Sequence, residues 1–213
     1  MIKINAFKKV LMLAPHTDDE FGCAATLKKL VNYGCEVKYI AFSACEESVP
    51  KGLPKDILYK ECMAATNRIG IKKENVEILN FKVRHFPNNR QEILEKMVQL
   101  NKIYCPNLVL LPCSQDSHQD HHTIYKEGFR AFKHCTILGY ELPQNLNTFS
   151  HTAYIKINEN ELKEKIEDMK SYKSQDHRNY SREDFIRGLS VVRGVQCGGK
   201  FAEAFEVIRM IMT

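Results

Sequence analysis

The stretch that decides the fold is residues 9–42, KVLMLAPHTDDEFGCAATLKKLVNYGCEVKYIAF. Its first part, Lys9–Ala14, is an apolar run that stops at a proline and predicts a buried strand. Residues 21–33 carry apolar side chains at helical spacing and stop at Gly34, a residue that favours the end of a helix. Residues 36–42 are rich in strand-forming side chains. A strand, a helix and a strand within about 35 residues indicate a βαβ unit and a parallel sheet.

The alternation of strands and helices continues along the chain. The pattern predicts helices over 58–69, 91–101, 122–132 and 159–171, strands over 76–81, 107–112 and 136–141, and a last helix or strand over 201–212. Residues 107–112, NLVLLP, are the most apolar of these and predict a central strand. The sequence therefore predicts an α/β protein, a three-layer α/β/α sandwich with a Rossmann-like, mostly parallel sheet. We expect one domain spanning residues 1–213.

Composition and charge narrow the class of protein. Hydrophobic residues make up 44% and charged residues 27%, which is typical of a globular chain. No apolar run approaches membrane-spanning length and no secretion signal is visible, so we expect a cytoplasmic protein without membrane insertion. The eight cysteines are scattered without C-x-x-C spacing, which favours buried reduced thiols over disulfides or a zinc ribbon.

The excess of basic residues is mild and spread along the chain. The formal net charge of +5 suits an anionic small-molecule partner. No nucleic-acid-binding motif and no basic run interleaved with aromatic residues is present, so we expect no nucleic acid partner. Nothing in the pattern decides between a monomer and a homo-oligomer.

Two polar segments directly follow apolar strands. They are residues 15–20, PHTDDE, and residues 114–122, SQDSHQDHH. The carboxyl ends of parallel strands meet at one edge of a sheet, where sites form in this class of fold. Imidazole nitrogens and carboxylate oxygens are the usual ligands of a catalytic zinc with an open position. Acidic residues that begin a helix are the alternative explanation, but they leave His16 unexplained.

The two segments together resemble the LmbE-like, or PIG-L, family of zinc deacetylases. Residues 15–20 resemble its (A/P)-H-P-D-D-E motif, and residues 118–121, HQDH, resemble its H-x-D-H motif. Residues 202–205, AEAF, resemble a further stretch of the family. The order, the spacing and the strand contexts agree over nearly the whole chain. Thr17 stands where the family usually has proline, a change that affects the stiffness of the loop and removes no ligand.

The resemblance implies a metal site and a mechanism. His16, Asp19 and His121 would hold Zn²⁺, and a site of two histidines and one aspartate also suits Fe²⁺. Such a metal lowers the pKa of water to about 7 and polarises the amide carbonyl.

The resemblance also implies that Asp18 is the general base and that His118 polarises the substrate. Asp120 follows His118 closely, so we expect it to hold the His118 imidazole in its charged form and thereby to support the oxyanion. Glu20 is expected to have a structural role. His122 is expected to point away from the metal.

The activity that the resemblance implies is hydrolysis of the acetamide of an N-acetylated sugar, a GlcNAc-type conjugate or a nucleotide-linked sugar. Candidate substrate-binding residues are Arg84, Arg193 and Lys200, and the Gly-rich segment 187–200 is a candidate phosphate cradle. Surface ion pairs and plain glycine turns are the alternatives. Two other functions stay open: a zinc amidase for another small N-acyl conjugate, and a non-catalytic carbohydrate- or nucleotide-binding Rossmann-like protein. Against a nucleotide-binding protein, this chain lacks the G-x-G-x-x-G turn after its first strand. A non-catalytic carbohydrate-binding relative would be expected to have lost Asp18 or a ligand, and none is missing.

Overall fold

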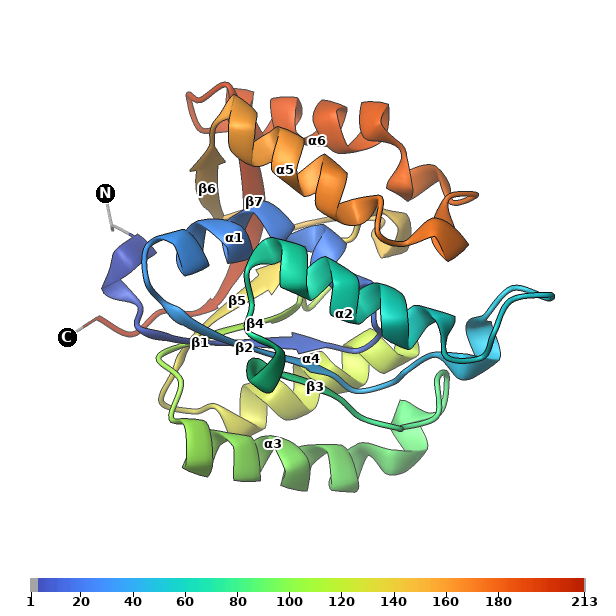
Figure 1. Cartoon of the computed structure of the whole chain (residues 1–213). Coiled ribbons are helices and arrows are strands. Elements are labelled where there is room, and N and C mark those ends of the chain that lie inside the picture. The colour runs from blue at the N-terminus through green and yellow to red at the C-terminus, as the bar shows by residue number, and fades with distance from the viewer. Residues whose placement is uncertain (1–3, 213) are drawn as a thin grey trace.

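The computed structural model describes residues 4–212 and contains a seven-stranded sheet with helices on both faces (Figure 1). The strands are β1 (Lys9–Ala14), β2 (Glu36–Ala41), β3 (Val76–Ile78), β4 (Leu108–Pro112), β5 (Thr136–Tyr140), β6 (Ala153–Ile157) and β7 (Phe201–Arg209). The α-helices are α1 (Ala24–Asn32), α2 (Ile57–Ile69), α3 (Arg90–Tyr104), α4 (Gln119–Ala131), α5 (Glu159–Met169) and α6 (Glu183–Gln196). The strand order is β3-β2-β1-β4-β5-β7-β6.

Strands β1 to β5 are parallel, and β7 runs antiparallel to both β5 and β6. Successive side chains of a strand point to opposite faces, so β1 supplies two separate cores. Val10 and Met12 join the core under α1, α2, α5 and α6, whereas Leu11 and Leu13 join the core under α3 and α4. Figure 1 shows these helices above and below the sheet. The predicted three-layer sandwich is therefore confirmed.

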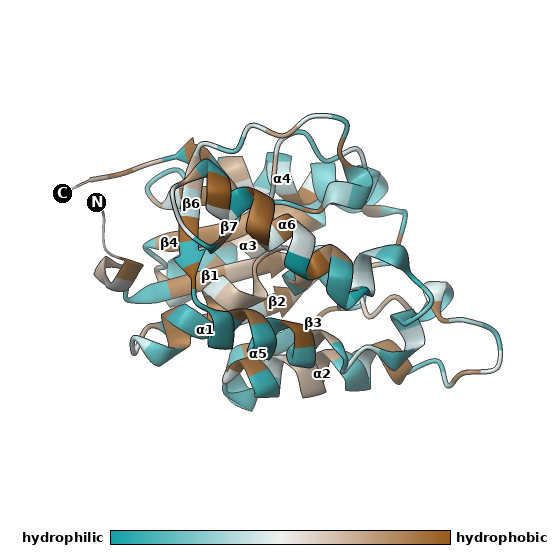
Figure 2. Cartoon of the chain, turned by 90° about the horizontal axis from the view of Figure 1, so that it is seen from above, coloured by the Kyte–Doolittle hydropathy of each residue, from teal (hydrophilic) through white to brown (hydrophobic). Residues whose placement is uncertain are grey.

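The helices cover the sheet with their apolar sides. Figure 2 shows hydrophobic and hydrophilic residues alternating along helices such as α5, the pattern of amphipathic helices on a buried sheet. Helix α5 begins with a capping box, in which Asn158 and Glu161 bond each other's backbone N–H groups. No helix within residues 4–212 has the length and apolar character that crossing a membrane requires.

Two elements of the structure were not predicted from the sequence. Strand β6 forms the edge of the sheet, and α6 spans the segment expected to be a glycine-rich loop. Gly194 in α6 is needed because a Cβ there would lie 2.5 Å from the carbonyl carbon and oxygen of Lys200. The glycine thus marks close packing of a helix against the backbone that enters β7, and not a free loop. Residues 201–212, left open between helix and strand, form β7 over most of their length.

The topology brings the two polar segments to one place. Strand β1 pairs with β4 in parallel, with Met12 opposite Leu110, so both strands end at the same edge of the sheet. Residues 15–20 leave β1 there, and residues 113–118 leave β4. The site is built at this edge, as the strand order predicts.

Candidate metal centre

The loop after β1 is shaped by its own polar groups. The backbone N–H of His16 donates to Asp19 Oδ2 at 2.7 Å, which folds the loop back on itself. A short 3-10 turn, Asp19–Gly22, then leads into α1. Its last residue, Gly22, packs where a Cβ would lie 2.8 Å from the carbonyl oxygen of Glu141. This close packing places Asp19 under the carboxyl edge of the sheet.

The second segment enters α4 at the metal centre. His118 is the N-cap of α4, and its Nδ1 accepts the backbone N–H of Asp120 at 3.2 Å. Asp120 and His121 occupy the first turn of the helix, and both are buried. The beginning of one helix therefore aims three of the predicted side chains at the loop after β1.

The three predicted ligands converge. His16 Nδ1 lies 3.1 Å from His121 Nε2 and 3.6 Å from Asp19 Oδ2. Asp19 Oδ1 lies 3.5 Å from His121 Nε2. Zinc–ligand bonds of 2.0–2.1 Å in a tetrahedron put neighbouring ligand atoms about 3.3 Å apart. The three groups therefore have the spacing of ligands that share one small cation.

The outer sides of the two imidazoles are occupied by carboxylates. His121 Nδ1 lies 2.8 Å from Asp116 Oδ2, and His16 Nε2 lies 3.0 Å from Asp120 Oδ2. A proton on each of these nitrogens satisfies the carboxylate and leaves the lone pairs of His16 Nδ1 and His121 Nε2 facing each other. Two facing lone pairs beside the Asp19 carboxylate favour a cation between them.

Burial of these groups also favours a bound cation. Asp19 is 5% exposed, and burial raises the pKa of its carboxyl to about 8, an effect that the nearby His16 opposes. A bound divalent ion would stabilise the carboxylate form in the same place. The nitrogens of His16, His118 and His121 also lie within 4.8 Å of one another, so His118 borders the centre as well. The donor set fits a divalent metal such as Zn²⁺ or Fe²⁺.

Asp120 contacts a different imidazole from the one that we expected. Its carboxylate bonds His16 Nε2 and accepts the backbone N–H groups of Arg84 at 2.6 Å and Phe86 at 3.2 Å. Burial alone would raise the pKa of Asp120, but these hydrogen bonds hold it below its usual value. Asp120 therefore orients His16, and only its backbone N–H bonds the His118 side chain.

His118 is neutral rather than charged. Burial, and then the neighbouring His121 and His16, lower the pKa of His118 to about 4. Because its Nδ1 accepts a backbone N–H, the proton of the neutral ring resides on Nε2. The side chain lines the cavity described next. It can therefore donate one hydrogen bond there without carrying a charge.

A cavity of about 650 Å³ opens over the centre. His16, Asp18, Asp19, His118 and His121 form its floor, and the segment between α5 and α6 forms a wall with Gln175, His177, Arg178, Asn179 and Tyr180. Its volume lies within the usual range for a small-molecule site.

Asp18 is half-buried in this cavity, and the hydroxyl of Tyr180 lies 3.5 Å from Asp18 Oδ2. Burial, and then the charge of Asp18, raise the pKa of Tyr180, so the phenol is a neutral donor beside this carboxylate.

Glu20 ends the loop after β1, residues 15–20, which we call the metal loop, and its buried side chain does not line the cavity. It is 0% exposed, and its carboxyl group accepts the hydroxyl of Tyr39 at 2.7 Å and the hydroxyl of Tyr172. Tyr172 also bonds the carbonyl oxygen of Thr17. Burial raises the pKa of Glu20 to about 8, although the two phenols oppose the rise. The expected structural role fits this position, because the network ties the metal loop to Tyr172, which comes just before the wall segment, residues 173–181.

Of the three predicted substrate contacts, one lies at the cavity. Arg84 lines it, with a left-handed backbone (φ 69°) and a side-chain hydrogen bond to Ser48 Oγ at 3.3 Å. Its exposed side chain leaves it accessible to a ligand.

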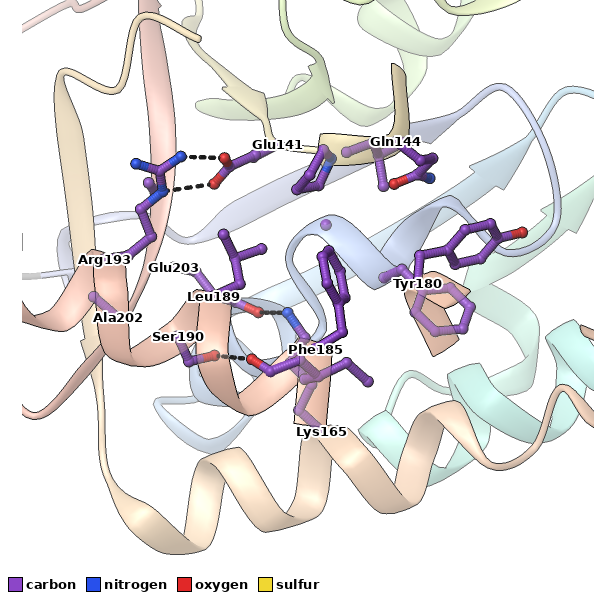
Figure 3. A pocket seen from close by; sticks show the side chains of 16 residues that line it. Glu141, Gln144, Lys165, Tyr180, Phe185, Leu189, Ser190, Arg193, Ala202 and Glu203 are labelled. Carbon is purple, nitrogen blue, oxygen red and sulfur yellow. Dashed lines mark hydrogen bonds and ion pairs between the residues drawn. The ribbon is translucent and has the colours of Figure 1, made fainter. Parts of the chain in front are cut away.

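Arg193 and Lys200 lie elsewhere. Arg193 pairs with Glu141 through two nitrogens and lines a separate, nearly filled cavity of about 30 Å³ (Figure 3). Lys200 is exposed and pairs with Glu159 at 2.9 Å. The backbone amides of Gly198 and Gly199 bond carbonyls of α6, so they form no phosphate cradle.

Several residues that line or support the site were not predicted from the sequence. Asp116 lies within the second motif segment, and its position five residues before His121 was the available signal. Tyr180, His177 and Arg178 lie in a segment without motif or periodicity, and only folding brings them over the metal loop. His122, as expected, points away from the centre and packs against Tyr125.

Comparisons with known proteins agree with this geometry. The sequence model of the family "PIG-L: GlcNAc-PI de-N-acetylase" matches residues 11–132. No curated protein matches the chain in sequence. The N,N'-diacetylchitobiose deacetylase from Pyrococcus horikoshii has a similar structure, with a TM-score of 0.80 and 22% identity over 95% of this chain and 84% of that one.

Two further solved structures share the fold. A deacetylase of the teicoplanin biosynthetic pathway has a TM-score of 0.76 and 17% identity over 97% of this chain and 100% of that one. GalB, a 4-carboxy-2-hydroxymuconate hydratase from Pseudomonas putida, has a TM-score of 0.75 and 15% identity over 97% and 98% of the two chains. At these identities the likeness concerns the fold alone. The family match spans more than half of the chain and includes both motif segments, so the chain belongs to the PIG-L family.

Proposed function

We propose that this protein is a metal-dependent N-deacetylase that hydrolyses the acetamide of an N-acetylated sugar and releases acetate and the free amine. The observation that carries the proposal is the convergence of His16, Asp19 and His121 on the floor of a 650 Å³ cavity, with Asp18 beside them. Membership of the PIG-L family and the deacetylases among the similar structures support the same reaction.

The roles of the residues follow from their positions. A divalent cation held by His16, Asp19 and His121 would polarise the amide carbonyl and make water a better nucleophile. Asp18 takes the proton from the attacking water and passes it to the nitrogen of the leaving amine as the C–N bond breaks. His118 donates from Nε2 to the carbonyl oxygen as negative charge develops on it. Asp120 and Asp116 fix the two imidazole ligands.

Compartment and substrate charge are also part of the proposal. All eight cysteines are free thiols, which supports a reducing compartment, the cytoplasm. The net charge of +5 and the two arginines that line the cavity, Arg84 and Arg178, support a substrate with an anionic group.

The direct test is acetate release from a panel of N-acetyl sugars, with zinc-loaded protein, the same protein treated with a chelator, and Asp18→Asn. The proposal predicts release by the loaded wild type only. Release from non-sugar N-acyl conjugates but from no sugar would instead support the zinc amidase alternative. No hydrolysis of any amide by loaded protein would contradict the proposal.

A further inference from the structure

The wall segment between α5 and α6, residues 173–181, is held firmly against the body of the protein. The backbone N–H and hydroxyl of Ser174 bond Glu61 of α2 at 2.9 and 2.5 Å. Just before the segment, Tyr172 bonds the metal loop at Thr17 and Glu20. Inside it, the carbonyl of Arg178 accepts both the backbone N–H and the hydroxyl of Ser181. The side chains that this segment presents to the cavity are therefore supported by a fixed backbone.

Arg178 is one of the few arginines within residues 4–212 that have no carboxylate partner. Within residues 4–212, six of the nine arginines lie within 4.0 Å of a carboxylate: Arg68, Arg90, Arg130, Arg182, Arg187 and Arg193. Arg209 instead lies over the ring of Phe129 and bonds a backbone carbonyl. Arg84 and Arg178 are the remaining two, and both line the cavity over the metal centre.

The two arginines enter the cavity wall from different parts of the fold. Arg84 follows β3 and reaches Ser48, whereas Arg178 belongs to the wall segment that carries Tyr180. The charge of Arg178 is near enough to Tyr180 to oppose the rise of that phenol's pKa. Both guanidinium groups are exposed, and the carboxylates of the cavity, Asp18 and Asp19, belong to the metal loop on its floor. The wall of the cavity thus carries two guanidinium groups whose N–H donors have no carboxylate partner, and the floor carries the proposed reactive centre.

We propose that Arg178 and Arg84 form an anion subsite that binds the phosphate of a phosphorylated N-acetyl sugar, either a sugar phosphate or a nucleotide-linked sugar. This inference rests on the proposed deacetylase function and names its substrate class. A phosphate offers several oxygens, so it can accept from two guanidinium groups at once, and such charge-assisted bonds are among the strongest in proteins. Arg178 is then a specificity-determining residue, and it takes no part in the chemical step.

The kinetic test compares substrates that differ only in the anionic group. We expect kcat/KM for N-acetylglucosamine 1-phosphate, or for its uridine diphosphate conjugate, to exceed that for methyl N-acetylglucosaminide. Arg178→Gln should lower the value for the phosphorylated substrate about 10- to 100-fold more than the value for the methyl glycoside, so that the preference for the phosphate is lost. The two phosphorylated arms distinguish a sugar phosphate from a sugar nucleotide. Arg182→Gln is the matched control, because Arg182 is nearby in sequence but pairs with Asp184 and does not line the cavity.

A binding measurement separates this inference from the proposed reaction. Glucosamine 1-phosphate and methyl glucosaminide lack the acetyl group, so neither is hydrolysed, and calorimetry can compare their affinities for wild type, Arg178→Gln and Arg182→Gln. We expect at least about 10-fold tighter binding of the phosphate by wild type and by Arg182→Gln, weakened by added salt, and loss of the preference in Arg178→Gln. Equal binding of the two ligands by wild type, or an unchanged preference in Arg178→Gln, overturns the subsite even if the protein deacetylates sugars.

Discussion

His16 Nδ1 and His121 Nε2 lie 3.1 Å apart, although 105 positions separate the two residues along the chain. Each ring turns its other nitrogen to a buried carboxylate, Asp120 for His16 and Asp116 for His121. Those carboxylates fix which nitrogen of each ring faces inward. The site is therefore organised by two pairs of residues, and each of the two imidazoles has its own carboxylate partner.

The first prediction concerns a metal ligand. His121→Ala should reduce bound zinc from about one per chain to near zero, because it removes one of three protein ligands. Elemental analysis of protein purified without chelator measures this. His122→Ala is the control, since His122 is the next residue but packs against Tyr125 outside the centre, and it should keep its zinc. Full zinc content in His121→Ala would remove His121 from the ligand set.

The second prediction concerns the partner of that ligand. Asp116→Ala leaves His121 Nδ1 without its acceptor, so the ring loses its fixed orientation. We expect metal affinity to fall about 10- to 100-fold while the fold is kept. Competition with a chelator of known affinity measures the change. An unaltered affinity, equal to that of the exposed-site control Asp56→Ala, would show that Asp116 has no influence on the metal.

The third prediction concerns proton transfer. Asp18→Asn keeps the shape of the side chain but cannot take a proton, so the rate of acetate release should fall about 10²- to 10⁴-fold. Bound zinc should stay at the level of wild type, because Asp18 is not among the converging groups. A loss of only a few-fold would take Asp18 out of the role of general base.

The fourth prediction concerns the buried carboxyl at the end of the metal loop. With a pKa of about 8, Glu20 is protonated at pH 7, so Glu20→Gln preserves its charge. The amide oxygen can accept from one of the two hydroxyls of Tyr39 and Tyr172, and the amide NH₂ can donate to the other. We expect Glu20→Gln to cost less than about 1 kcal/mol of unfolding free energy. Glu20→Ala removes the carboxyl group that bonds both buried hydroxyls and leaves a cavity in its place, so it should cost about 2–4 kcal/mol. Denaturant unfolding compares the three proteins.

The same carboxyl gives a pH dependence with a definite sign. The folded protein holds the Glu20 proton up to about pH 8, and the unfolded chain releases it near the ordinary value of 4.5. The stability due to this group is therefore complete below pH 4.5 and is lost as pH rises through 8. Metal-free Glu20→Gln should gain on wild type between pH 6 and pH 9. A constant difference in midpoint across that range would show that Glu20 does not titrate there.

How much of the molecule the sequence could predict depends on how local each cause is. The βαβ unit at residues 9–42 was predictable because apolar spacing and the stop at Gly34 are local signals. Helix α6 was not, because Gly188, Gly194 and three exposed valines weaken its helical propensity, and Gly194 serves contact with the turn before β7. The edge strand β6 is short and only partly buried, so its pattern is weak.

The candidate site was also predictable only in part. The three converging residues, His16, Asp19 and His121, could be named from motifs, since each follows a strand end whose position the topology fixes. The contacts of Asp120 could not, because it follows His118 by only two residues in the chain, whereas the helix turns its carboxylate toward His16. Arg193 was predicted to bind substrate because of its charge and neighbouring glycines, but it forms an ion pair with a buried residue, Glu141. Charge in a sequence does not reveal which charges already have partners.

We propose that His16, Asp19 and His121 hold one divalent cation. Anomalous diffraction from crystals of zinc-loaded protein, recorded on either side of the zinc absorption edge, shows which groups bind the metal. The proposal predicts a single strong peak at the cavity floor, bonded to His16 Nδ1, His121 Nε2 and a carboxylate oxygen of Asp19. A peak bonded to other residues, or no peak between these three groups in loaded crystals, would contradict it.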